Sequence, residues 1–162
     1  MTEASLAGGL GVPPVQGPPG NRMAVAFLAL LGLLVSVYML AYALGFTGDV
    51  MCGVGDCEKV QSSPYAWIGP VPVSALGVAG YLALLVVSLL GLQPSMQHSR
   101  TVPLALLGGT VAGVGFSAYL TYLEAFVIHA WCQWCVISAI LMVLAFLASL
   151  PELRSLRSAP RA

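Results

Sequence analysis

The stretch AFVIHAWCQWCVISAILMVLAFLASL, residues 125–150, decides the fold, because it joins a long apolar run to a pair of thiols. It contains no Asp, Glu, Lys or Arg. A helix of about 20 apolar residues is enough to cross the roughly 30 Å of hydrocarbon in a bilayer. Cys132 and Cys135 lie near its start, in the motif CQWC, a familiar redox or metal-binding spacing. The run therefore predicts a membrane helix that carries chemistry at one end.

Three further runs have a similar length and also lack charged residues. Only 7% of the 162 residues are charged and 59% are hydrophobic, whereas soluble domains average about 25% charged residues. Backbone groups in lipid must find their hydrogen bonds within the segment, so each run should be helical. The sequence predicts an all-α integral membrane protein, a bundle of four transmembrane helices over about 23–46, 71–92, 101–123 and 127–150.

The basic residues predict how this bundle is oriented. Five of the six Lys and Arg residues fall before the first run, between the second and third, or after the fourth, namely Arg22, Arg100, Arg154, Arg157 and Arg161. An even number of crossings puts these three places on one side, which the positive-inside rule makes cytoplasmic. We therefore expect a multi-pass protein of the bacterial inner (cytoplasmic) membrane, with both termini in the cytoplasm.

The two ends of the chain are expected to lie outside the bundle. Residues 1–21 are rich in Gly and Pro and poor in large apolar groups, so they are interpreted as a disordered cytoplasmic tail. The apolar run that follows is too long for a signal-peptide core and is expected to be a retained first helix. Residues 22–150 then form the membrane domain, and 151–162 form a cytoplasmic C-terminal tail.

The predicted topology gathers all four cysteines at the extracytoplasmic face. Cys52 and Cys57 fall in the connection between the first two helices, which is expected to cap an active site, and Cys132 and Cys135 fall near the start of the fourth. Positions i and i+3 share a helix face, and a helix N-terminus favours a thiolate. A disulfide that closes so short a loop as 52–57 stabilises little through chain entropy. These features favour two redox-active pairs that exchange disulfides.

Two other interpretations of the cysteines stay open at this point. The pairs can be purely structural disulfides, or four thiolates can hold zinc or another soft metal in a metal-binding membrane protein or transporter. Thiols that face an oxidising compartment tend to form disulfides. The redox interpretation is therefore preferred, with no metal site expected.

A redox pair in a membrane needs an electron acceptor, and a quinone (ubiquinone or menaquinone) is the expected one. Val136 follows Cys135, so there is no C-x-x-C-H haem motif, and no dinucleotide-binding motif is present. Aromatic residues gather at the predicted outer end, either as a ring-binding pocket or as an interfacial belt. The pocket residues expected from this region are Ser63, Tyr119, Tyr122, Trp131 and Trp134. Glu124, near the outer boundary, is expected to be solvated.

Several of these segments together resemble one known family. A spaced pair, Cys52 and Cys57, is followed by EKVQSSPYAW at 58–67 and by SAYLTYLEAFVIHAWCQWC at 117–135. Over about residues 22–150 the chain resembles the vitamin K epoxide reductase family, and specifically its bacterial members that reoxidise disulfide-forming partners. Ala139 stands where vertebrate members have a tyrosine, which argues against vitamin K epoxide reduction as the native activity.

The resemblance implies a role for each cysteine. Cys132 and Cys135 are implied as the active-site pair, with Cys135 reacting with quinone. Cys52 and Cys57 are implied as a shuttle pair, in which Cys57 exchanges with Cys132 and Cys52 meets the external partner. Ser63 matches a Ser/Thr position near the quinone. Since the sequence has no fused thioredoxin-like domain, the expected partner is a separate periplasmic thioredoxin-like protein, besides quinone and lipid; no nucleic acid is expected.

Overall fold

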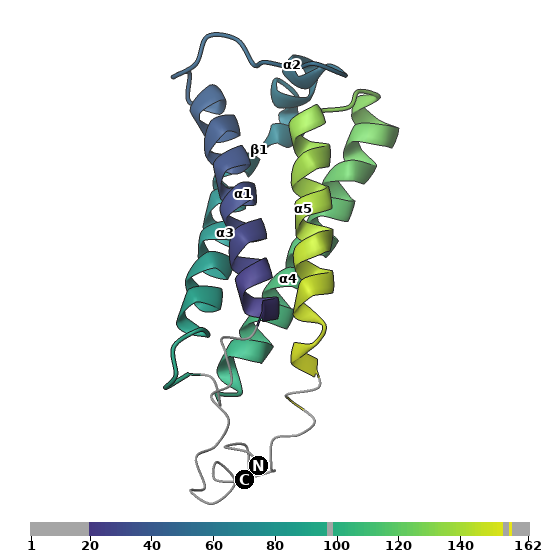
Figure 1. The fold of residues 1–162 in the computed structure, drawn as a ribbon. Coiled ribbons are helices and arrows are strands. Elements are labelled where there is room, and N and C mark those ends of the chain that lie inside the picture. Colours follow the sequence, from purple (N-terminus) through teal and green to yellow (C-terminus); the bar gives the residue numbers. More distant parts are fainter. Residues whose placement is uncertain (1–19, 97–98, 154–155, 157–162) are drawn as a thin grey trace, which may run out of the picture.

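Four long helices stand side by side in the computed structural model, which describes residues 20–96, 99–153 and 156 (Figure 1). They are α1 (Gly20–Ala43), α3 (Val73–Leu90), α4 (Thr101–Tyr122) and α5 (Gln133–Ser149). The predicted disordered tail lies, but for its last two residues, outside the described residues. Gly20 and Asn21 belong to α1, which therefore begins before Met23.

Short elements connect the long helices at one end of the bundle. The connection from α1 to α3 contains α2 (Cys57–Gln61), the 3-10 turn η3 (Pro64–Ala66), and a small antiparallel hairpin of β1 (Trp67–Ile68) and β2 (Val71–Pro72). The connection from α4 to α5 contains a π-helical turn, η4 (Leu123–Ile128). Both connections lie at the end of the bundle that is opposite the start of α1 and the end of α5 (Figure 1).

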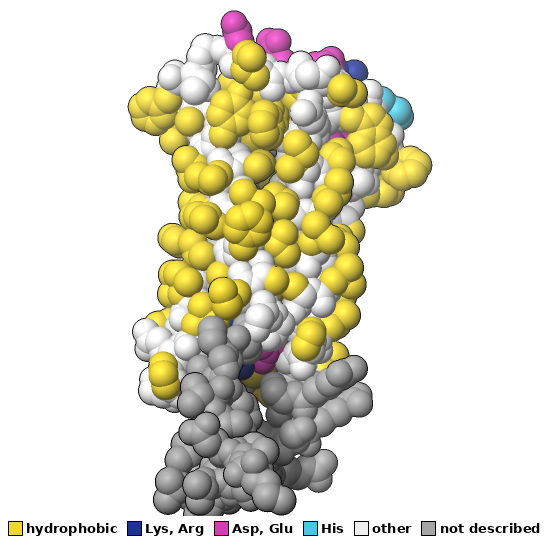
Figure 2. Space-filling view, viewed as in Figure 1, with side chains coloured by type: hydrophobic (Ala, Val, Ile, Leu, Met, Phe, Trp, Pro, Cys, Tyr) yellow, Lys and Arg dark blue, Asp and Glu magenta, His cyan; other side chains and the backbone are white. Residues whose placement is uncertain are grey.

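Within the described part of the chain, three helical segments are long and apolar enough to cross a membrane: Gly20–Ala43, Val73–Leu90 and Thr101–Ile128. Helix α5 is equally apolar but has only 17 residues, about 26 Å at 1.5 Å per residue. Apolar side chains cover the middle of the bundle, and acidic side chains gather at the end that carries α2 (Figure 2). This distribution is the one that a bilayer around the middle of the bundle would require.

Small residues let the helices approach one another closely. Helix α1 packs against α3 and α5, and α4 packs against α5 and α3. Gly32 lies against the ring of Tyr81, whose hydroxyl donates a hydrogen bond of 2.7 Å to the carbonyl oxygen of Ser138. Gly113 likewise faces the thioether of Met142. Glycines at such contacts are typical of helix packing in lipid, where close approach supplies van der Waals contact.

The fourth helix differs most from its predicted bounds. It was expected from about residue 127, but α5 begins at Gln133, because residues 123–128 continue α4 as the π turn. The turn ends at His129, whose backbone adopts a left-handed conformation with φ 53°. Consequently Glu124, which the sequence placed between two apolar runs, belongs to the third apolar helical segment.

Candidate active site

The loop after α1 is bound to the start of α5 through its backbone. The Asp56 N–H donates to the Trp131 carbonyl oxygen at 2.8 Å, and Gly55 pairs with Cys132 in an isolated β-bridge. The side-chain oxygen of Gln133 accepts hydrogen bonds of 3.0 Å from the N–H groups of Gly53 and Val54. These contacts hold the loop against the residue that begins the second cysteine pair.

Trp134 adds a second attachment for the same loop. Its indole N–H donates to the Met51 carbonyl oxygen at 2.8 Å, and its ring packs against Tyr38 of α1 with 5.1 Å between ring centroids. The Tyr38 hydroxyl accepts a hydrogen bond from the Met51 N–H at 2.9 Å. Residues 51–56 are therefore fixed between α1 and α5.

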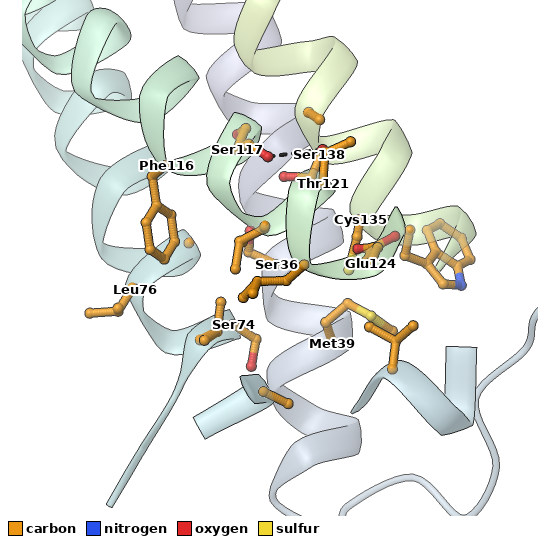
Figure 3. Close-up of a pocket in the computed structure, with 18 of the residues that line it drawn as sticks. Ser36, Met39, Ser74, Leu76, Phe116, Ser117, Thr121, Glu124, Cys135 and Ser138 are labelled. Atoms are coloured by element: carbon orange, nitrogen blue, oxygen red, sulfur yellow. Dashed lines mark hydrogen bonds between the residues drawn. The ribbon is translucent and has the colours of Figure 1, made fainter. Parts of the chain in front are cut away.

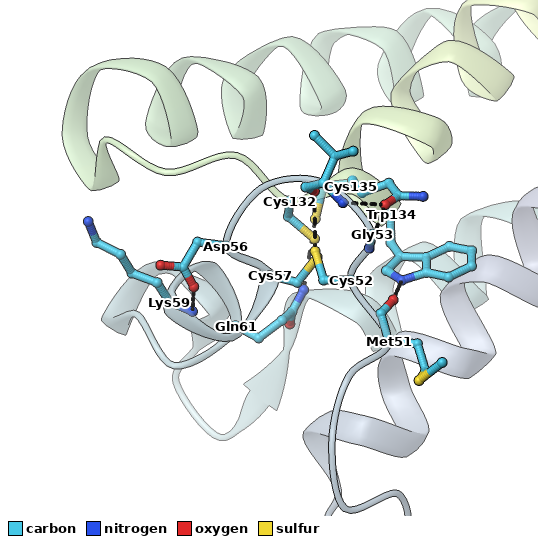
Figure 4. Close-up of a disulfide and its surroundings, with 12 residues drawn as sticks. Met51, Cys52, Gly53, Asp56, Cys57, Lys59, Gln61, Cys132, Trp134 and Cys135 are labelled. Atoms are coloured by element: carbon cyan, nitrogen blue, oxygen red, sulfur yellow. Dashed lines mark hydrogen bonds between the residues drawn. A yellow bond between two sulfur atoms is a disulfide. The ribbon is translucent and has the colours of Figure 1, made fainter.

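These attachments bring the four sulfur atoms into one cluster (Figure 4). Cys52 and Cys57 form a disulfide, with 6.0 Å between their Cα atoms, whereas Cys132 and Cys135 are free thiols. Cys57 and Cys132 are fully buried and share an apolar cluster, and Cys52 and Cys135 pack against it half-buried. The loop disulfide thus has one sulfur near the surface and one beside the second pair.

Cys132 and Cys135 differ in their surroundings. Cys132 is the N-cap of α5 and has an extended backbone, and Cys135 lies one turn further into the helix. A side-chain hydrogen bond with Cys135 lowers the pKa of the Cys132 thiol to about 7. Since a free cysteine has a pKa near about 8.5, Cys132 is the thiol prepared to act as a thiolate near neutral pH.

Glu124 is buried beside this pair, and the expectation that it is solvated is wrong. Its side chain is 4% exposed, and its Oε2 accepts a hydrogen bond from the Cys132 N–H at 3.0 Å. It also interacts with the Cys135 thiol. The carboxyl group is held there because the π turn carries the helix past residue 123, so that Glu124 packs within the bundle.

A cavity of about 170 Å³ opens next to Cys135, between α1, α3, α4 and α5 (Figure 3). Most of its lining is apolar, and the polar exceptions include Gln61, Ser63, Ser74 and Glu124. The Ser74 hydroxyl is buried without a hydrogen-bond partner, whereas the Ser63 hydroxyl donates to the Val60 carbonyl oxygen at 2.7 Å. An apolar cavity with a few polar groups is the usual form of a small-molecule site.

The five predicted pocket residues separate into two groups. Ser63 and Trp134 line the cavity. Tyr119, Tyr122 and Trp131 are each about half exposed and do not line it. On α4, the residues between the two tyrosines, Leu120 and Thr121, face the cavity instead. The period of α4 decides which of these side chains turn inward, and the two tyrosines fall on its outer face.

Three residues at this site were not predicted from the sequence to belong to it. Gln61 donates to the sulfur of Met39 at 3.4 Å and approaches Cys135 at 3.8 Å. Ser74 lies in the first turn of α3 and lines the cavity, and Glu124 contacts both members of the second pair. The available signal was Glu124 itself, an acid at the end of an apolar run and eight residues before Cys132.

Comparison with known protein families finds a match over this part of the chain. A family model described as the vitamin K epoxide reductase family matches residues 23–150. The match spans both cysteine pairs, the loop that joins α1 to α3, and the helices that line the cavity.

Proposed function

The chain belongs to the vitamin K epoxide reductase family, and on this premise we propose that it couples thiol oxidation outside a membrane to reduction of a quinone within it. Membership implies a membrane thiol/disulfide oxidoreductase. The observation that supports the finer proposal is the arrangement of the pairs: a loop disulfide is attached over a free thiol pair that borders an apolar cavity.

The first exchange takes place at the loop disulfide. The thiolate of a reduced, separate thioredoxin-like partner attacks the half-exposed Cys52 sulfur, and Cys57 leaves as a thiolate. The second thiol of the partner then attacks the mixed disulfide, so that the partner leaves oxidised and Cys52 and Cys57 are both reduced. The direction follows from burial, because Cys57 is 1% exposed and cannot be reached from outside.

The second exchange passes the electrons inward. The Cys57 thiolate attacks Cys132 of an oxidised Cys132–Cys135 pair, and Cys135 leaves. Cys52 then attacks Cys57, which restores the loop disulfide and releases Cys132. The product is an oxidised loop pair beside a reduced helix pair, the same distribution of disulfide and free thiols that the structure has.

The cavity residues fit a quinone, either ubiquinone or menaquinone. An apolar protein cavity of about 150 Å³ holds benzene, so a volume of about 170 Å³ accommodates one ring. The unpartnered hydroxyl of Ser74 supplies a donor for a carbonyl oxygen, since a buried hydroxyl is costly without a partner. Ser63 and Trp134 complete the wall near Cys135. A bound quinone would supply a sink for two electrons and two protons.

The soft-metal hypothesis is less well supported by the donor set. Cys52 and Cys57 are bonded to each other, which removes two of the four thiolates that such a site would use. Within residues 20–96, 99–153 and 156, no three His, Cys, Asp or Glu side chains are grouped to hold a metal ion. The thiol-exchange function is therefore the one that we propose.

We further propose that α5 is a fourth crossing, with both termini cytoplasmic and the cysteines outside, in the inner membrane of a bacterium. Helix α5 packs along α1 and α4 over its length, so it occupies the same depth as these two candidate spans. The acidic residues near α2 then face the periplasm, and the net result is disulfide formation in secreted proteins.

The test is quinone reduction by the purified protein in detergent, with a reduced dithiol protein as donor and a short-chain ubiquinone as acceptor. We expect turnover in the wild type and none in Cys135→Ala. A matched Ser62→Ala change, at an exposed residue outside the cavity wall, should turn over normally. Normal turnover in Cys135→Ala would contradict the proposal.

A further inference from the structure

Glu124 is a buried acid that the exchange steps above do not use. It is 4% exposed and lies in the apolar segment Thr101–Ile128. An ionisable side chain inside a membrane segment is costly and marks a functional site by default. It also lies in a π turn, a form of helix that is found frequently at functional sites.

The contacts of Glu124 place its carboxyl group between a reacting thiol and the cavity. One oxygen accepts the Cys132 N–H at 3.0 Å, and the carboxyl group also interacts with the Cys135 thiol. Glu124 and Cys135 both line the cavity, and Figure 3 shows the two side chains beside one another. A proton on the Cys135 sulfur thus has a carboxyl group beside it on the cavity side.

Oxidation of the helix pair must release two electrons and two protons. Formation of the Cys132–Cys135 bond sends both electrons to the acceptor in the cavity. Cys132 gives up its proton first, because its pKa is about 7. The Cys135 proton is released at the wall of the cavity, where the Glu124 carboxyl group lies beside the thiol.

We infer that Glu124 is the proton carrier of this site: its carboxylate takes the proton of the Cys135 thiol and delivers it to the reduced quinone oxygen. The second proton of the hydroquinone comes from the water phase and replaces the one that Cys132 released there. Two electrons and two protons are then accounted for. This inference rests on the proposed function, because it assumes that the acceptor in the cavity is a quinone.

No other carboxyl group lines the cavity among the described residues. The titratable groups that face Glu124 from α5 and its N-cap are the Cys135 and Cys132 thiols. From α2, which packs against η4, Glu58 and Lys59 are exposed. Two tyrosines, Tyr65 and Tyr81, line the cavity wall. The Tyr81 hydroxyl donates its hydrogen bond to the Ser138 carbonyl oxygen.

The decisive variant is Glu124→Gln in the full chain. The amide oxygen can still accept the Cys132 N–H, but the side chain cannot carry a proton. We expect reduction of a short-chain ubiquinone to fall by about 10²–10⁴-fold, the usual range for loss of a general acid–base group, and its dependence on pH to change. Reduction of the Cys52–Cys57 disulfide by a dithiol should keep its wild-type rate.

A second readout needs no quinone. In infrared difference spectra of the protein poised between dithiol and disulfide, the wild type should show a carboxyl signal that changes as the Cys132–Cys135 bond forms. Glu124→Gln should lack this signal. Glu152→Gln, which removes the buried carboxylate at the other end of the bundle, should retain it.

The outcomes separate the inference from the function on which it rests. If the wild type does not reduce quinone, the proposed function fails, while the infrared signal still decides whether Glu124 takes the proton. If Glu124→Gln keeps both the wild-type quinone rate and the infrared signal, the inference is overturned. Should Glu124→Gln not fold, Glu124→Asp decides: it should retain the carboxyl signal, and a folded Glu124→Asp without it overturns the inference.

Discussion

At the scale of single residues, Cys132 and Cys135 are two thiols of one pair with different tasks. Cys132 caps a helix, receives the Cys135 hydrogen bond, and lies in the same buried cluster as Cys57. Cys135 instead borders the cavity and contacts Glu124. One thiol is therefore placed for exchange with the loop and the other for reaction with a molecule in the cavity.

This difference predicts how the Cys132 thiol titrates when the Cys132–Cys135 pair is reduced. With a pKa of about 7 for Cys132, thiolate should rise from about a tenth at pH 6 to about nine tenths at pH 8. The ultraviolet absorbance of the thiolate measures it, with the Cys52–Cys57 disulfide intact. In Cys135→Ala the midpoint should move up toward the ordinary cysteine range, because the hydrogen bond from Cys135 is lost. A midpoint that is the same in both proteins would contradict this assignment.

Gly55 is the residue on which the loop attachment depends most. Its φ is +91°, and a Cβ there would overlap the carbonyl oxygen of Trp131. Gly55→Ala should destabilise the docked loop by about 1–3 kcal/mol, the usual cost of a strained backbone position, and slow disulfide exchange between the pairs. Stopped-flow thiol trapping measures the exchange. Gly48→Ala, with open space around its Cβ, is the matched control, and equal rates in both variants would count against the docking.

The residues of the site were only partly predictable from the sequence. The cysteines could be paired by spacing, and Ser63 and Trp134 followed from their place beside them. Glu124 was assigned to solvent because a helix was expected to end at residue 123. A π turn leaves no composition signal, so nothing in the sequence showed that Glu124 turns inward, or that Tyr119 and Tyr122 turn outward.

At the scale of elements, the position of α5 relative to α3 depends on a glycine and an aromatic ring. Gly32 of α1 leaves room for Tyr81 of α3, and Tyr81 in turn binds the backbone of α5 at Ser138. One contact between α1 and α3 thus fixes the helix that carries Cys135. The same three helices, together with α4, line the cavity.

Filling that space should therefore disturb both stability and the site. A Cβ at Gly32 would overlap the Tyr81 ring, so Gly32→Ala should destabilise the bundle by about 1–3 kcal/mol, as overpacking does. Thermal unfolding in detergent measures the change. Gly108→Ala on α4, where the Cβ meets no atom, should be neutral or slightly stabilising. Equal melting temperatures for the two variants would contradict the packing described here.

The elements were easier to predict than their ends. Four apolar runs predicted four helices in the right order, since apolar length is a strong signal. The start of α5 was misplaced because residues 125–132, apart from His129, remain apolar through the π turn and the connection. Hydropathy does not distinguish a helix that continues from a new helix that begins.

At the scale of the whole molecule, a buried ion pair closes the end of the bundle opposite the cysteines. Arg22 contacts Glu152 at 2.8 Å, with both side chains under 5% exposed, and donates to the Gly91 carbonyl oxygen at 2.6 Å. The pair joins the start of α1, the end of α3 and the residues after α5. Arg22 was one of the basic residues that predicted the cytoplasmic side, but nothing in the sequence indicated that it pairs with Glu152.

Removing one member of this pair should be costly. Arg22→Ala removes the buried ion pair and two hydrogen bonds to the Glu152 carboxylate, which should destabilise the protein by about 3–5 kcal/mol. The double variant Arg22→Met, Glu152→Met should recover most of that loss, because neither member of the buried pair then remains without the other. Unfolding monitored by thiol accessibility measures both. A double variant no more stable than Arg22→Ala would contradict a pairing role.

The central claim is that electrons cross between the two pairs through Cys57 and Cys132. The most direct test is the variant Cys52→Ala, Cys135→Ala, in which only these two thiols remain, compared with Cys57→Ala, Cys132→Ala. Under mild oxidation, mass spectrometry should find a Cys57–Cys132 disulfide in the first protein and at least about 10-fold slower bridging of Cys52 to Cys135 in the second, because Cys57 and Cys132 share one buried cluster and the pKa of Cys132 is lowered. Equal bridging in the two, or no Cys57–Cys132 disulfide, would contradict the relay.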